Sequence, residues 1–214
     1  MIDIDDTVEE EWLKPKEGFN DGLSTTKPDW IKEIHRKYLT AGADCIETNT
    51  FGSNKIKLDE YGFGSQTIEL NQKNAELARS VCDEFTDRQR FVIGSMGPTG
   101  YLPSSNDADL GQMPLSQIRD AFELQAEGLI KGNADALLIE TSQDILEVKL
   151  AVEASHIAME KTGKKVTKRK VMQCLTDVVH TTVVGGSQAA ESNLTNMIHE
   201  GTLCQSLSAR PWPP

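Results

Sequence analysis

Short apolar runs alternate with helical patterns along most of this 214-residue chain, and this alternation limits the fold more than any other feature. The apolar runs are rich in Val, Ile and Leu, which is typical of parallel strands covered on both faces. Their starts recur roughly every 35 to 47 residues, the spacing of βα units. We therefore predict an α/β fold in which strands and crossover helices follow one another. The strands are expected at 44–50, 91–96, 136–141 and 170–176, and the helices at 28–41, 66–85, 115–131 and 145–159.

Two local features lead to finer predictions. In the helix over 28–41, Ile31, Ile34 and Tyr38 are expected to form the apolar stripe, and His35 is expected to be partly exposed. Near the end of the last predicted strand, Thr181 and Thr182 are interpreted as part of a loop.

Charge and hydropathy limit the partners of the chain. Acidic residues outnumber basic residues 33 to 22, whereas binding to a phosphate backbone depends on Lys and Arg. A basic cluster at 161–170 is interpreted as a solvated connection, with a weak contact to an acidic partner as the alternative. The apolar runs are far shorter than the roughly 18 residues that span a bilayer, and the acidic first residues do not resemble a secretory signal. We therefore expect a cytoplasmic protein that binds neither nucleic acid nor membrane.

Sequence-local metal, disulfide and nucleotide motifs are absent. Cys45, Cys82, Cys174 and Cys204 are scattered without CxxC spacing, so we expect the thiols to pack as small hydrophobic groups. No GxGxxG follows the first predicted strand, and no GxxxxGK[ST] occurs, which argues against a nucleotide-binding α/β protein.

Polar residues follow each predicted strand, where α/β folds place their chemistry. Glu140 ends a strongly apolar run, and a carboxylate in such a place needs a partner. Glu47 has the same position one strand earlier, and Gly97 would allow a ligand to approach the main chain closely. A structural role in bracing the loops is the alternative for each residue. The candidate substrate-binding residues are Glu47, Thr48, Asn49, Ser95, Gly97, Glu140, Thr141 and Asp177.

Four motifs in this order resemble the homocysteine S-methyltransferase family, which includes the homocysteine-binding domain of methionine synthase. They are ADCIETNTFGSN at 43–54, KLDEYG at 57–62, GSMGPTG at 94–100 and LIETSQDILE at 138–147. The resemblance extends from about Asn20 to Gly186. We therefore expect a partial homocysteine-binding βα-repeat domain over 21–186, between a poorly defined segment 1–20 and an irregular tail 187–214.

The resemblance implies a (β/α)8 barrel that holds a catalytic zinc in its mouth. Homocysteine binds such a zinc through its sulfur, which stays a thiolate and is a better nucleophile than the thiol. The thiolate attacks a methyl group on methylcobalamin or on a sulfonium or ammonium donor, so cobalamin and methyltetrahydrofolate are expected only in a parent enzyme. The resemblance also implies that Glu140 holds the amino group of homocysteine and that Asp177 matches an acidic position of the family.

The zinc ligands of the family have no counterpart in this sequence. They come from an Asn-Cys pair and a Gly-Gly-Cys-Cys run, whereas Gly185 and Gly186 are followed here by Ser187. The four predicted strands also fall short of a closed barrel, which takes about 250 residues. We therefore expect a partial TIM barrel that binds homocysteine, is inactive alone, has no metal ligands of its own and could be completed by a second chain. The alternative is a non-catalytic or degenerate chain that acts only as an interaction partner or has no activity.

Overall fold

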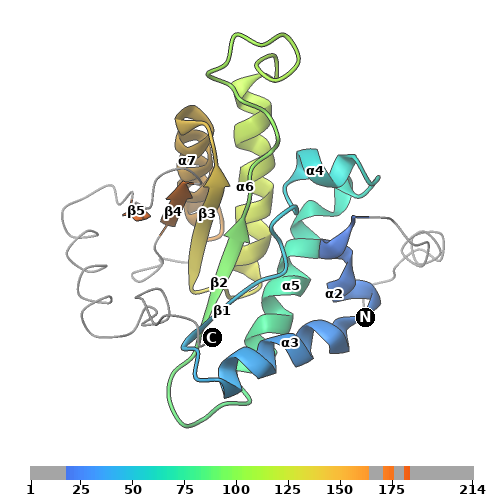
Figure 1. Ribbon diagram of the computed structural model, residues 1–214, viewed down its shortest axis with the longest axis vertical. Coiled ribbons are helices and arrows are strands. Elements are labelled where there is room, and N and C mark those ends of the chain that lie inside the picture. Colours follow the sequence, from blue (N-terminus) through green and yellow to red (C-terminus); the bar gives the residue numbers. More distant parts are fainter. Residues whose placement is uncertain (1–17, 164–170, 176–180, 184–214) are drawn as a thin grey trace, which may run out of the picture.

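The structure, a computed structural model, describes residues 18–163, 171–175 and 181–183 (Figure 1). Within these residues, strands β1 to β4 are parallel and lie in chain order, and β5 runs antiparallel to β4. The predicted α/β fold, with parallel strands adjacent in chain order, is therefore confirmed. The strands are β1 (Cys45–Glu47), β2 (Phe91–Met96), β3 (Ala136–Ser142), β4 (Val171–Leu175) and β5 (Thr181–Val183).

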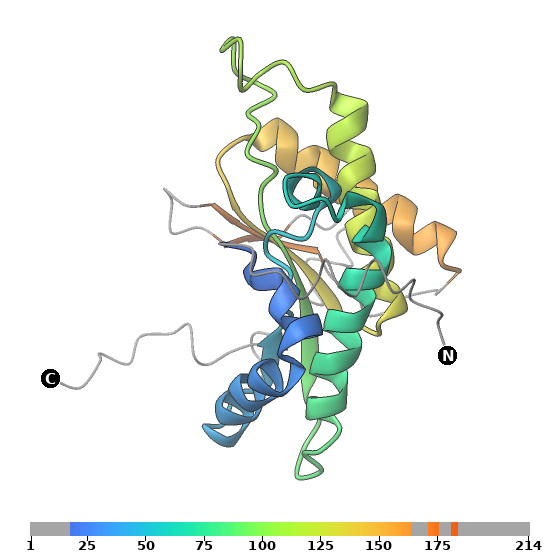
Figure 2. The same cartoon turned by 90° about the vertical axis from the view of Figure 1, so that its right-hand side faces the viewer.

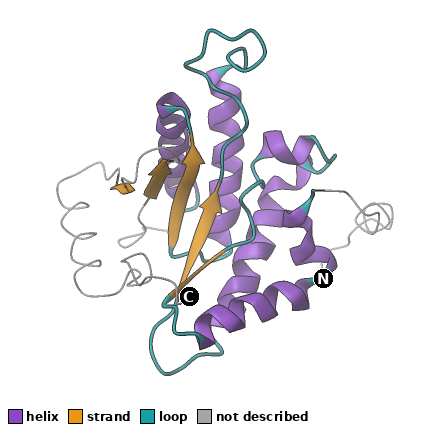
Figure 3. Ribbon diagram, in the orientation of Figure 1, coloured by secondary structure: helices purple, strands orange, loops and turns teal. Residues whose placement is uncertain are grey.

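Helices connect the strands and cover one face of the sheet (Figures 2 and 3). α5 packs against α6 and α6 against α7, while α3 contacts β1 and α5. α3 begins at Pro28, whose fixed φ suits a first helical turn. α7 begins after Asp144, whose carboxylate accepts hydrogen bonds from the amides of Leu146 and Glu147. The helices are η1 (Asn20–Gly22), α2 (Leu23–Thr26), α3 (Pro28–Thr40), α4 (Lys55–Asp59), η2 (Gly64–Gln66), α5 (Thr67–Cys82), α6 (Leu115–Lys131) and α7 (Ile145–Lys161).

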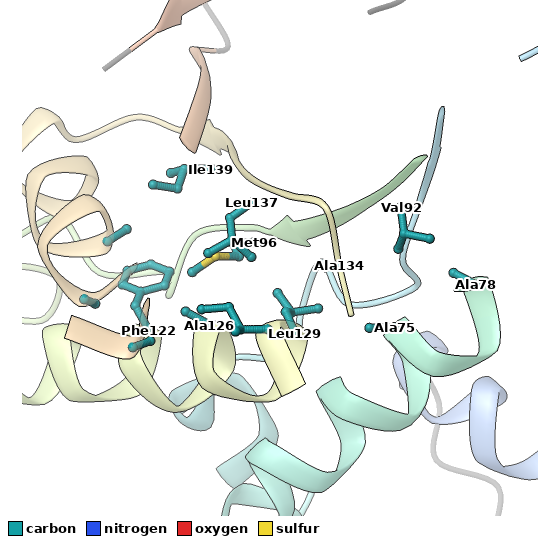
Figure 4. Close-up of a cluster of buried hydrophobic side chains, with 14 of the residues drawn as sticks. Ala75, Ala78, Val92, Met96, Phe122, Ala126, Leu129, Ala134, Leu137 and Ile139 are labelled. Atoms are coloured by element: carbon teal, nitrogen blue, oxygen red, sulfur yellow. The ribbon is translucent and has the colours of Figure 1, made fainter. Parts of the chain in front are cut away.

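The hydrophobic core lies between the sheet and these helices (Figure 4). Alternate residues of β2 and β3, such as Val92 and Leu137, are fully buried against α5 and α6. The two helices approach closely at Gly128, where a Cβ would lie only 2.4 Å from the carbonyl oxygen of Ile68. The labelled core residues are Ala75, Ala78, Val92, Met96, Phe122, Ala126, Leu129, Ala134, Leu137 and Ile139.

The intervening residues of each strand face away from the core helices, because side chains alternate along a strand. On this face Leu138 and Glu140 of β3 are half-buried, Ser95 of β2 is buried and Glu47 of β1 is exposed. The polar members, Glu47, Ser95 and Glu140, are all at the carboxyl ends of their strands. The fold therefore brings together polar groups that are far apart in the sequence.

Two predictions were wrong. His35, with Ile31 and Leu39, forms the buried stripe of α3, while Ile34 and Tyr38 are 48% and 63% exposed. Both stripes have helical spacing, so packing against β1 and α5 decided between them. Thr181 and Thr182 belong to β5 rather than to a loop, in keeping with the preference of β-branched residues for strands.

β1 is also shorter than predicted, because it ends at Glu47. The amide of Thr48 still donates to the carbonyl of Ile93 at 2.9 Å. Beyond it, the hydroxyl of Thr50 bonds to the carbonyl of Ser95 at 2.7 Å, so that a side chain replaces the regular strand ladder.

Ion pairs hold the amino ends of the strands together, opposite the polar rim. Arg90, whose side chain is 3% exposed, donates to the carbonyl of Ala43 at 2.7 Å and to the carboxylates of Asp44 and Asp87. Asp135 pairs with Arg79 and accepts the amide of Val92. We regard this end as structural, as in α/β barrels, whose chemistry lies at the carboxyl ends. None of the helices described here combines the length and apolarity needed to span a membrane.

Candidate functional site

Glu140 and Ser95 form the centre of the candidate site, at the carboxyl ends of β3 and β2. The hydroxyl of Ser95 donates to Oε1 of Glu140 at 2.5 Å. This hydrogen bond fixes one oxygen of the carboxylate and leaves acceptor capacity on the rest of the group. Glu140 is half-buried and Ser95 is 2% exposed, so the serine is a rigid support and the glutamate is the accessible member.

A second carboxylate, Glu47, stands at the end of β1. Glu47 is exposed, yet partial burial of its carboxylate, and secondly the negative charge of Glu140, raise its pKa above the usual value. Because the negative charges of the two carboxylates repel each other, a cation between them would be stabilised. The two residues therefore form an acidic rim suited to a small positively charged group.

Thr48 is buried behind this rim and holds the peptide group of Ser95. Its Oγ1 accepts the amide of Ser95 at 3.1 Å and lies 2.5 Å from Oγ1 of Thr50. The hydroxyl of Thr50 donates to the carbonyl of Ser95, so the proton between the two threonines comes from Thr48. Both polar groups of the Ser95 main chain are thus held by threonine side chains, and the Thr48 hydroxyl is engaged within the protein.

Gln125 reaches the same peptide from the helix layer. Its amide nitrogen donates to the carbonyls of Thr50 at 2.8 Å and Ser95 at 3.3 Å. The side chain is completely buried, and its Oε1 has no hydrogen-bond partner among the described residues. Gln125 therefore ties α6 to the ends of β1 and β2 at the cost of one unsatisfied acceptor.

Thr141 follows Glu140 in an unusual conformation, with φ of 59°. A β-branched residue rarely adopts this left-handed region. The pairing with β4 shifts here, because Glu140 lies opposite Cys174 and Ser142 opposite Leu175, which leaves Thr141 as the extra residue of a β-bulge. Strained bulges occur often beside functional sites.

Two buried carboxylates at the start of α7, the N-cap residue Asp144 and Glu147 in the first turn, hold the loops around this bulge. Glu147 accepts from the amide and hydroxyl of Thr99, at 2.8 and 2.6 Å, and from the hydroxyl of Ser142 at 2.7 Å. Asp144 accepts from the amide and hydroxyl of Ser104 at 2.7 and 2.8 Å. Burial acts to raise the pKa of Asp144, but these bonds and those from the amides of α7 outweigh it and lower the pKa. The loop after β2 is therefore fixed to the start of α7.

Asn49 connects the rim to the first described helices. Its side-chain amide donates to the carbonyl of Asn20 at 2.8 Å and to the hydroxyl of Ser24 at 3.3 Å. Nearby, Asp21 accepts from the amide of Gly52 and the hydroxyl of Ser53. Burial raises the pKa of Asp21, although these hydrogen bonds oppose it. The geometry thus gives Asn49 an anchoring contact.

Gly97 is buried, and the loop after β1 occupies the space beside it. Its amide donates to the carbonyl of Phe51 at 3.0 Å. A Cβ would lie 2.6 Å from that carbonyl oxygen and 2.7 Å from the Phe51 ring. Close packing against Phe51 is one reason for a glycine at this position, and approach of a ligand to Gly97 stays a prediction.

Asp177 lies outside the described residues. The remaining sequence-predicted residues, Glu47, Thr48, Asn49, Ser95, Gly97, Glu140 and Thr141, all lie at the carboxyl ends of β1, β2 and β3 or in the loops that follow. Sequence reasoning missed a second group, which braces the site from behind. Its members are Thr50, Thr99, Gln125, Ser142 and Glu147.

The described side chains do not fit a catalytic zinc. Nowhere among them do three His, Cys, Asp or Glu residues come together in a way that could hold a metal ion. Cys45 is in β1 and Cys82 in α5, and burial raises the pKa of the Cys82 thiol to about 11, which disfavours the thiolate that zinc requires.

Comparison with known proteins identifies the family. The sequence model of homocysteine S-methyltransferases matches residues 3–205. The chain belongs to this family. It is 45% identical over 152 residues to the methionine synthase of Mycobacterium tuberculosis and 43% identical to that of Mycobacterium leprae, with 70% of this chain aligned in each case. The chain spans 12% of the length of these methionine synthases.

Solved structures define the fold more closely. The oxidised form of the homocysteine methyltransferase MmuM from Escherichia coli superposes with a TM-score of 0.60 and 19% sequence identity, over 92% of this chain and 68% of that one. Its metallated form gives a TM-score of 0.58, also at 19% identity, over 77% of this chain and 58% of that one. The parallel βα repeats are therefore those of a partial (β/α)8 barrel, and the side of the sheet away from the helices corresponds to the barrel interior.

Proposed function

We propose that this chain binds homocysteine at the acidic rim formed by Glu140, Ser95 and Glu47, as the homocysteine-binding part of a methyltransferase of the methionine synthase type. The observation that carries the proposal is the hydrogen bond from Ser95 to Glu140, which presents a fixed, half-buried carboxylate at the mouth of the partial barrel. The family membership supports a methyl-accepting thiol as the ligand.

The rim suits the α-amino end of homocysteine. An ammonium group near Glu140 forms a charge-assisted hydrogen bond, about twice as strong as a neutral one. The same positive charge offsets the repulsion that, with burial, raises the pKa of Glu47. Binding should therefore weaken as pH falls, because Glu47, whose pKa is raised, loses its negative charge on protonation.

Methyl transfer needs more than the described residues. Because they do not fit a zinc site, we propose that other segments, or a second chain that completes the barrel, would hold any zinc, which would favour the thiolate form of homocysteine. We assign no described residue to cobalamin or methyltetrahydrofolate, which enter the proposal as groups of a longer enzyme. The product of the completed reaction would be methionine.

The missing metal fit also favours a second candidate function. In this case the chain, whose described residues do not fit a metal site, would be a non-catalytic member of the family that acts through an interaction alone. The two candidates differ in ligand binding, because only the first requires the rim to recognise homocysteine.

Calorimetric titration of the full chain under reducing conditions separates these candidates. L-homocysteine should bind, and 4-mercaptobutanoate, which lacks only the amino group, should bind at least about tenfold more weakly, as expected for loss of a charge-assisted hydrogen bond. Equal affinity for the two thiols would show that the acidic rim does not recognise the amino group of homocysteine. Absence of homocysteine binding would favour the non-catalytic alternative.

A further inference from the structure

The β-bulge at Thr141 changes which side of β3 its last residues face. Up to Glu140, half-buried positions alternate with buried positions that face the helices. Regular alternation would direct Thr141 toward the helices and Ser142 toward the barrel interior. Instead Thr141 is half-buried, and Ser142 is 2% exposed and contacts Glu147 of α7. The extra residue has thus placed Glu140 and Thr141 together on the accessible side.

This arrangement requires interactions that stabilise the left-handed conformation of Thr141. A strained residue relaxes to an ordinary extended strand unless the surrounding structure determines its position. Ser142, the residue after the bulge, is held in place by its own side chain, because its hydroxyl donates a hydrogen bond to Oε2 of Glu147. The other oxygen of Glu147 is held by the amide and hydroxyl of Thr99, in the loop after β2.

The three residues of this clamp, Thr99, Ser142 and Glu147, are almost inaccessible, with 1%, 2% and 1% exposure. Glu147 therefore cannot touch a ligand at the rim. Its carboxylate is buried without a basic partner among the hydrogen bonds described, and burial of a charged group is unfavourable unless each oxygen is satisfied. If the strand shifted at Ser142, Glu147 would lose the hydrogen bond from the Ser142 hydroxyl. The buried carboxylate therefore stabilises the register that contains the bulge.

We propose that Glu147 is a positioning residue: with Ser142 and Thr99 it holds Thr141 in the left-handed conformation, and this sets Glu140 and Thr141 side by side toward the ligand. The binding half of this inference rests on the proposed homocysteine function. The clamp itself does not, because it concerns the conformation of the unliganded chain.

NMR of the unliganded full chain tests the clamp directly. Main-chain coupling constants of Thr141 report its φ, which should be positive in the wild type. Ser142→Ala should shift Thr141 toward negative φ, because the hydroxyl that holds the bulge is gone. Glu147→Gln should preserve positive φ, since the amide can still bond to Thr99 and Ser142.

Ser155→Ala is the matched control, because Ser155 is also a buried serine, lies in α7 and donates to the carbonyl of Ala151 rather than to the clamp. It should leave the couplings of Thr141 unchanged. A Ser142→Ala chain that is folded and retains positive φ at Thr141 would overturn the clamp, whether or not homocysteine binds.

Calorimetry with L-homocysteine tests the second half. Ser142→Ala should weaken homocysteine binding by about tenfold, because loss of the hydrogen bond to Glu147 disturbs the geometry of the rim. Ser155→Ala should bind homocysteine as the wild type does. Thr141→Gly accepts the left-handed conformation without strain and should stay folded, yet lose affinity because the bulge is no longer rigid and the hydroxyl is absent.

The outcomes separate the two proposals. If the wild type does not bind homocysteine, the proposed function and the ligand-facing half of this inference both fail, and the couplings still decide the clamp. If the wild type binds and a Ser142→Ala chain that has lost the positive φ at Thr141 binds equally well, the proposed function stands and the role of the bulge is refuted.

Discussion

Substitution of Glu140 by Gln removes one negative charge from the rim and preserves the shape of the side chain. In the structure, Oε1 of Glu140 already accepts the hydroxyl of Ser95 at 2.5 Å. A glutamine can keep that bond through its carbonyl oxygen, which directs its amide NH2 group toward the space left for the ligand. Two donors, the amide and the ammonium of homocysteine, would then face each other.

The expected loss follows from this geometry. A charge-assisted hydrogen bond contributes about 1.5–3 kcal/mol, which corresponds to a dissociation constant about 10- to 150-fold higher. Glu47→Gln is the matched control. Glu47 is more exposed than Glu140, and solvent screening reduces the contribution of an exposed pair to about 1 kcal/mol or less.

The assay is calorimetry with two ligands, L-homocysteine and 4-mercaptobutanoate. Glu140→Gln should reduce the affinity for homocysteine and leave that for the analogue without an amino group nearly unchanged. An equal loss for both ligands would show that the substitution acts through the fold. Unchanged affinity for homocysteine would assign Glu140 to structure and refute the reasoning.

Three further predictions concern stability and metal content. Burial lowers the pKa of His35 to about 4, so the contribution of neutral His35 to the free energy of unfolding is intact above the unfolded-state pKa near 6.5. As pH falls toward 4, about 3 kcal/mol of this stability is lost. His35→Leu should reduce this acid loss of stability in urea titrations, and a pH dependence identical to that of the wild type would contradict the prediction. Gly128→Ala should destabilise the fold by about 1–3 kcal/mol, because the added Cβ meets the carbonyl of Ile68 at 2.4 Å, and an unchanged melting temperature would exclude this clash. The purified chain should contain less than one zinc per chain and form no methionine with any donor; one tightly held zinc, with turnover abolished by a chelator, would show that the metal assignment is wrong.

The order of the strands could be predicted from the sequence because each apolar run is short and each connection shows helical spacing. The same reasoning located Glu47, Ser95 and Glu140, since parallel strands bring their carboxyl ends to one edge. The choice of buried face in α3 failed, because His35 and Ile34 both satisfy the helical period. Only the packing against neighbouring elements distinguishes them.

The bracing residues were harder to predict. A positive φ at Thr141 has no sequence signal when the residue is neither glycine nor asparagine. Asp144 and Glu147 are spaced as in a capping box, in which the side chain of the second residue accepts the main-chain amide of the first, the N-cap residue. In this fold Glu147 instead bonds to Thr99, 48 residues earlier. Such long-range hydrogen bonds depend on the completed sheet.

A crystal structure of the full chain with L-homocysteine tests the central claim most directly. The account predicts the ammonium group within hydrogen-bond distance of Glu140, with the Ser95 hydroxyl still bonded to the same carboxylate. Homocysteine bound elsewhere, or at the rim with its amino group away from Glu140, would contradict it.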